Sequence, residues 1–145
     1  MEADSILGIK DDLCSRWKDV YARLTDFPSD PDEGWMIGRN RPYDMSHRHY
    51  SHLLMAYPLY LVNRDQPGGK EMIVKSVNHW QSIKGALEGY SRTGAASLYA
   101  SVGEGDKALA YLEEFMQKSM QPNTCYQEGG NPVIETPLSG ARALL

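Results

Sequence analysis

Apolar residues in this chain recur mostly at three- and four-residue spacings, the periodicity of helices with one buried face. The first such segment begins at Ile6 and continues past Trp17 to Leu24. The segments 94–102 and 105–116 follow each other closely and are expected to form a helical hairpin. No alternating pattern typical of strands competes with these helices, so we predict an all-α fold. The predicted helices are 6–24, 53–61, 70–87, 94–102, 105–116 and 138–145.

Two long connectors interrupt the helical pattern. Residues 26–46 contain several prolines and glycines that break regular structure, but they also contain Trp35 and Tyr43. Residues 122–137 form a second connector of this kind. Long connectors with apolar residues are often functional in compact domains. We find no interdomain linker, low-complexity tract or short repeat, and therefore expect a single domain.

Composition narrows the function classes. The 145 residues carry a net charge of −4 without a basic block, which argues against general binding to nucleic acid or to membrane surfaces. No apolar run approaches the roughly 20 residues of a membrane span. Cys14 and Cys125 lie far apart, so neither a zinc ribbon nor a disulfide framework is indicated. Small neutral ligands remain compatible with this composition.

The most distinctive segment holds three of the four histidines within six positions, directly before an apolar stretch. His47, Arg48 and His49 are expected on a loop or first helical turn that faces a cleft. Imidazole and guanidinium groups supply hydrogen-bond donors and acceptors that suit a polyhydroxylated or anionic ligand. We therefore predict that this segment binds substrate.

A zinc site is the alternative for the same segment, because His47, His49 and His52 together offer three ring nitrogens. The pattern lacks a carboxylate or cysteine at helical spacing, and we therefore expect no metal and no cofactor. His52 falls one turn after His49 and is expected to pack against its neighbours. A metal-binding regulatory domain stays a rival hypothesis that stoichiometric zinc would support.

The histidine segment resembles the catalytic domain of family 95 glycoside hydrolases. The resemblance rests on 47–53, which matches the motif His-Arg-His-x-Ser-His-Leu, and on the following Tyr57-Pro58 pair. Residues 89–91 are similar to the family's Gly-Trp-Ser motif, and 96–108 are similar to its leucine-rich, Gly-Asp-containing hairpin. The order and spacing agree over about residues 35–145. The resemblance implies an (α/α)6 toroid and inverting hydrolysis of α-L-fucosides or, in some members, α-L-galactosides.

The same resemblance implies that residues 1–145 are part of a toroid that is truncated at both ends. The general acid of the family lies well upstream of the histidine motif, in a part that residues 1–145 do not contain, so the isolated fragment is expected to be inactive. Its partners would be a fucosylated or galactosylated carbohydrate and the rest of the parent polypeptide. The family further implies a secreted or periplasmic parent.

Residues 131–140 align with the family segment Gln-Ile-Asp-Gly-Asn-Phe-Gly, whose aspartate is the catalytic base. Glu135 takes that place and is our predicted base, with Glu128 and Asp44 as weaker candidates. Residues 136–139 replace the family's Gly-Asn-Phe-Gly, so this segment departs from the pattern. We expect Glu135 in a loop, partly buried between two prolines, as suits a general base.

The remaining site residues are assigned by their chemistry. His47 and His49 are expected to bind sugar hydroxyls, and Arg48 is expected to orient a neighbouring carboxylate. Trp35 could stack on the apolar face of a sugar, with core packing as its other interpretation, and Tyr43 is a weaker candidate. Trp17 and Trp80 occupy helical positions that predict core packing.

A function of another class is compatible with the same residues. The chain could be a helical carbohydrate-binding or interaction module that keeps the architecture of the toroid without its chemistry. The presence of an upstream carboxylate in the same polypeptide would distinguish the two hypotheses.

Overall fold

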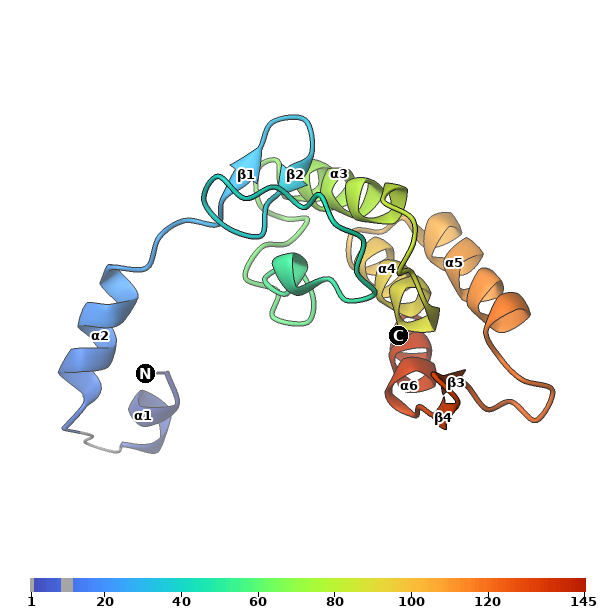
Figure 1. Cartoon of the computed structure of the whole chain (residues 1–145). Helices are drawn as coiled ribbons and strands as arrows, with labels where there is room; N and C mark the ends of the chain where they lie inside the picture. Colours follow the sequence, from blue (N-terminus) through green and yellow to red (C-terminus); the bar gives the residue numbers. More distant parts are fainter. Residues whose placement is uncertain (1, 9–11) are drawn as a thin grey trace.

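The computed structural model describes residues 2–8 and 12–145 (Figure 1). Within these residues the regular structure consists of six α-helices, one 3-10 turn and two short hairpins, so the prediction of a mainly helical fold is confirmed. The helices do not close into a ring in the described part of the chain. Their bounds are α1 Glu2–Leu7, α2 Cys14–Ala22, α3 Gly69–Ser82, α4 Gly89–Ser101, α5 Gly105–Lys118 and α6 Glu135–Arg142. The strand pairs are β1 Ser29–Asp30 with β2 Gly34–Trp35, and β3 Gln127–Glu128 with β4 Asn131–Pro132.

Helix α4 is the centre of the packed region, and it contacts α3, α5 and α6. Its sequence is rich in glycine, alanine and serine, which allow neighbours to approach closely. A Cβ atom at Gly94 would overlap the ring of Tyr50, so the absence of a side chain makes this contact possible. Trp80 from α3, Leu98 from α4 and Leu53 are fully buried in the core that results. Burying each such side chain contributes about 1.5–3 kcal/mol.

The start of α4 is held by a capping box between Glu88 and Ser91. The Glu88 amide donates to Ser91 Oγ at 3.1 Å, and the Glu88 side chain accepts the amide of the third helical residue. This arrangement satisfies two of the amide groups that a helix start leaves without a partner. Helix α5 begins after Glu104, whose carboxylate pairs with Lys70 at 2.7 Å and with Lys107 at 3.2 Å.

The N-terminal segment differs from the predicted single helix over 6–24. Helix α1 ends at Leu7, α2 begins at Cys14, and residues 9–11 of the predicted helix lie outside the described residues. Figure 1 shows both helices apart from the packed region. Helix α2 has no buried residue, and Trp17 is 48% exposed, so the prediction of Trp17 in the core was wrong. Periodicity identified the amphipathic helix, but no described element covers its apolar face.

The predicted helix over 53–61 was also wrong. The chain forms one 3-10 turn, Ser51–Leu53, followed by turns and a cis peptide bond between Tyr57 and Pro58. Proline lacks the amide hydrogen that a continuing helix needs. Leu53 is fully buried whereas Leu59 is 59% exposed, so the apolar run enters the core and then leaves it.

Helix α3 ends earlier than the predicted boundary at residue 87. Its last residue is Ser82, after which Ile83 adopts an extended conformation and Gly85 takes a positive φ of 127°. Helix α6, predicted over 138–145, instead begins at Glu135 and ends at Arg142. Across the residues with described placement, no helix combines the length and apolar character needed to span a membrane.

Candidate functional site

The backbone of the histidine segment is fixed by hydrogen bonds from the core. The carbonyl of His47 accepts from Trp80 Nε1 at 2.9 Å and from the Tyr43 hydroxyl at 3.1 Å. The carbonyl of Arg48 accepts from Ser91 Oγ at 3.0 Å. Helices α3 and α4 therefore position the loop, while the side chains of residues 47–49 remain exposed.

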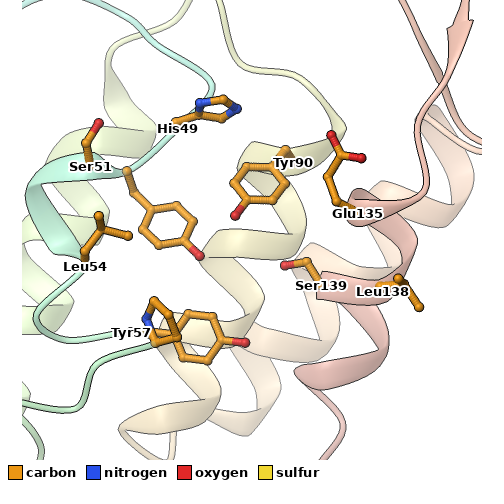
Figure 2. A pocket seen from close by; sticks show the side chains of 10 residues that line it. His49, Ser51, Leu54, Tyr57, Tyr90, Glu135, Leu138 and Ser139 are labelled. Carbon is orange, nitrogen blue, oxygen red and sulfur yellow. The ribbon is translucent and has the colours of Figure 1, made fainter.

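A cavity of about 620 Å³ opens between this loop, the start of α4 and helix α6 (Figure 2). His49 and Glu135 lie at one end of it, and Tyr57 lies at the other. Its size falls within the range of small-molecule sites, which are concave and mostly apolar with a few polar groups. The lining residues are His49, Tyr50, Ser51, Leu54, Tyr57, Pro58, Tyr90, Glu135, Leu138 and Ser139.

His49 is held in place by its ring neighbours. Its ring centroid lies 5.1 Å from that of Tyr90 and 5.2 Å from that of His47, both edge-on. The backbone amide of His49 donates to Nδ1 of His47 at 3.0 Å. Burial lowers the pKa of His49, the charges of Arg48 and His47 lower it further, and nearby glutamates oppose this shift. A neutral imidazole has one donor and one acceptor nitrogen, which suits a hydroxyl ligand.

Glu135 occupies the first position of α6 and lines the cavity. The expectation of a loop position was wrong, and its side chain is exposed rather than partly buried. The next residue, Thr136, takes the buried place instead, which turns Glu135 outward toward the cavity. A carboxylate in the first turn of a helix is stabilised by the helix dipole. Leu138 and Ser139 lie one turn further along the helix and line the same cavity.

Arg48 does have a carboxylate neighbour, as the sequence led us to expect. Its Nε atom lies 2.6 Å from Oε1 of Glu128 in β3. Asp44, another candidate base, is exposed and lines a separate cavity of about 280 Å³ beside His47. Neither Glu128 nor Asp44 lines the larger cavity.

Two aromatic candidates lie in the core. Trp35 is only 7% exposed, its amide donates to Ser76 Oγ, and it does not line the larger cavity. Trp35 therefore packs in the core, as the second interpretation of this residue predicted. Tyr43 is 4% exposed and lines the smaller cavity. Trp80 is fully buried, which confirms the prediction for this residue.

His52 is directed into the protein, apart from the other two histidines. Its ring stacks on Tyr43 with centroids 4.3 Å apart, which confirms the prediction that it packs. Burial lowers the pKa of His52 to about 4. Within residues 2–8 and 12–145 no group of three potential ligands is arranged to hold a metal ion.

Sequence reasoning missed the aromatic lining of the cavity. Tyr50 and Tyr90 stack with centroids 5.8 Å apart, and Tyr57 lies beyond them toward the far end. Tyr50 occupies the variable position within the histidine motif, and this position was the available signal. Tyr90 reaches the cavity only because α4 packs beside the loop, which no local spacing encodes.

Comparison with known proteins identifies the family of the chain. The model of the glycosyl hydrolase family 95 catalytic domain matches residues 1–132. The match extends further toward the N-terminus than the resemblance, which began near residue 35, and it ends shortly before Glu135. No curated protein matched the chain. Because the matched residues make up most of the chain, this protein belongs to the glycosyl hydrolase family 95 catalytic domains and is a glycoside hydrolase that acts on carbohydrate.

Proposed function

We propose that this chain carries part of the active site of an inverting glycosidase that cleaves α-L-fucosyl or α-L-galactosyl linkages. The observation that supports this most directly is the cavity shared by His49 and Glu135. These residues are far apart in the sequence, yet a base candidate and a sugar-binding candidate meet in one site. The cavity volume of about 620 Å³ is sufficient for a monosaccharide unit.

In this mechanism Glu135 is the general base that activates water. An inverting glycosidase needs a second carboxyl group, which protonates the leaving oxygen from roughly 6.5–9.5 Å away. We assign that acid to a part of the parent polypeptide upstream of the histidine motif. Residues 1–145 then form a partial catalytic domain, and the isolated chain is inactive.

Substrate recognition is divided between polar and apolar groups. His49 lines the larger cavity and binds sugar hydroxyls, because a neutral imidazole both donates and accepts hydrogen bonds. His47 lines the adjoining smaller cavity and binds a hydroxyl there. Tyr57 and Leu138 offer apolar surface at the cavity that suits the C–H face of a pyranose. L-Fucose carries a methyl group where L-galactose carries a hydroxymethyl group, so this apolar lining favours the fucoside.

The decisive test is Glu135→Gln in the full parent polypeptide. Loss of a general base lowers turnover by roughly 100- to 10,000-fold. Glutamine keeps the shape of the side chain, so we expect the affinity for fucose to change little. Turnover is measured on a panel of α-L-fucosides and α-L-galactosides, and sugar affinity is measured by calorimetry.

Glu113→Gln is the matched control, because Glu113 is an exposed carboxylate on α5 outside the cavity. We expect this variant to retain normal turnover. Near-normal turnover in Glu135→Gln would show that Glu135 is not the base. A wild-type polypeptide that binds glycans without cleaving them would instead support the binding-module hypothesis.

A further inference from the structure

The hairpin of β3 and β4 is tied to the histidine segment through Glu128. One carboxylate oxygen of Glu128 lies 2.6 Å from Arg48 Nε, and the other accepts the Tyr126 hydroxyl at 3.2 Å. The Glu128 side chain is 20% exposed. Both oxygens are thus engaged, which leaves this carboxylate poorly placed to take a proton from water.

Tyr126 connects the same hairpin to the core. Its side chain is 3% exposed, and its ring lies edge-on to Phe115 of α5 with centroids 5.6 Å apart. The Tyr126 hydroxyl accepts the amide of Gly89, the first residue of α4, at 3.0 Å. A Cβ atom at Gly89 would lie 2.6 Å from the Tyr126 ring, so glycine is what allows this approach.

The loop that carries Arg48 is anchored to the same end of α4. Ser91 donates its hydroxyl to the carbonyl of Arg48 at 3.0 Å, two residues after Gly89. The start of α4 therefore holds the histidine segment through Ser91 and the hairpin through Tyr126. Glu128 and Arg48 close the connection between the two segments. Beyond the hairpin, the Val133 amide donates to the Tyr126 carbonyl at 3.0 Å, and the chain then enters α6 at Glu135.

We propose that Arg48, Tyr126 and Glu128 form a clamp that holds His49 and Glu135 in place across the cavity. Glu128 and Tyr126 are positioning residues in this arrangement, and Arg48 acts through its carboxylate partner rather than on the sugar. The catalytic consequence of the clamp rests on the proposed hydrolase function. The structural consequence of the clamp is the placement of Glu128 beside His49, and this placement does not depend on the proposed hydrolase function.

The charges around His49 provide a readout that is independent of turnover. Arg48 and His47 from its own loop lower its pKa, whereas Glu128 from β3 and Glu135 from α6 raise it. His49 also lies against the Tyr90 ring of α4. Removing the negative charge of Glu128 should therefore lower the pKa of His49 further.

The experiment compares Glu128→Gln and Tyr126→Phe with wild type in the full parent polypeptide. A small displacement of catalytic groups reduces rates by up to about 100-fold. We expect kcat to fall roughly 10- to 100-fold in Glu128→Gln, with KM changed less than about three-fold. Tyr126→Phe should also lower kcat, although it retains the negative charge of Glu128 beside His49. The pKa of His49 is measured by histidine hydrogen–deuterium exchange with mass spectrometry.

Glu113→Gln is again the control, since it removes an exposed carboxylate outside the clamp. Unchanged kcat and an unchanged pKa of His49 in a folded Glu128→Gln variant would overturn the proposal. A raised KM with normal kcat would also overturn it, because that result describes a sugar contact. Complete loss of turnover with retained sugar binding would identify Glu128 as the base and overturn it as well.

Two additional measurements test the clamp if Glu128→Gln does not fold or if the parent polypeptide shows no hydrolysis. If Glu128→Gln does not fold, Arg48→Lys keeps the charge but changes the contact geometry, and a normal kcat in that variant would overturn the clamp. If the wild-type polypeptide hydrolyses no fucoside or galactoside, the hydrolase proposal fails. The His49 titration then still decides whether Glu128 occupies its proposed place.

Discussion

His52 shows how one buried side chain can make stability depend on pH. Both of its ring nitrogens are buried without a hydrogen-bond partner, and its ring stacks on Tyr43. Burial lowers its pKa from 6.5 to about 4 in the folded protein. The unfolded chain therefore binds a proton at higher pH than the folded protein does, and stability declines as the pH falls from about 6.5 to about 4.

We expect protonation of His52 in the unfolded chain to lower the free energy of unfolding by about 2 kcal/mol between pH 7 and pH 5. His52→Phe keeps an aromatic ring against Tyr43 and cannot be protonated, so it should remove that part of the pH dependence. Urea unfolding of both proteins, followed by circular dichroism at the two pH values, measures the difference. Parallel dependence of stability on pH in wild type and variant would contradict the assignment.

At the scale of elements, the start of α4 serves both the fold and the site. Ser91 is fully buried, it accepts the Glu88 amide, and it donates to the Arg48 carbonyl. One hydroxyl thus caps a helix and anchors the loop next to His49. A local structural rule and the geometry of the site depend on the same atom.

Replacing this hydroxyl should therefore affect both properties. We expect Ser91→Ala to lower the unfolding free energy by about 1–3 kcal/mol, because a cap is lost and the partly buried Arg48 carbonyl loses its donor. Thermal unfolding measures the stability, and fucose affinity reports on the loop. Ser101→Ala is the control, since the Ser101 hydroxyl donates to the Leu98 carbonyl of its own helix. Equal losses in the two variants would argue against a special role for Ser91.

At the scale of the whole molecule, sequence patterns predicted the helices better than they predicted which helices contact each other. Periodicity located α5 and the start of α3 well because their apolar faces do pack on the core, but it placed the end of α3 too late. It failed over 53–61, where Pro58 and the return of the chain to the surface override the pattern. The motif predicted His49 as a site residue and the resemblance predicted Glu135, and both side chains line the same cavity. Their shared cavity depends on the packing of α4 with α6, which no sequence spacing specifies.

The largest mismatch between pattern and packing is the apolar surface of α2, which also determines how the isolated chain should behave. Trp17, Val20 and Tyr21 of α2 are 48%, 41% and 66% exposed, and Leu24, which follows the end of the helix, is 66% exposed. Exposed apolar patches of this kind promote association. We therefore expect the isolated 145-residue chain to self-associate at micromolar concentration, and the double variant Trp17→Ser with Leu24→Ser to shift it toward monomer.

Sedimentation velocity over a concentration series measures this shift. Leu109→Ser is the matched control, because Leu109 is 52% exposed but lies on α5, away from the α2 surface. This control should associate like wild type, since Leu109 lies outside the apolar surface of α2. A monomeric wild-type chain, or equal effects of the two variants, would show that the apolar face of α2 does not drive association.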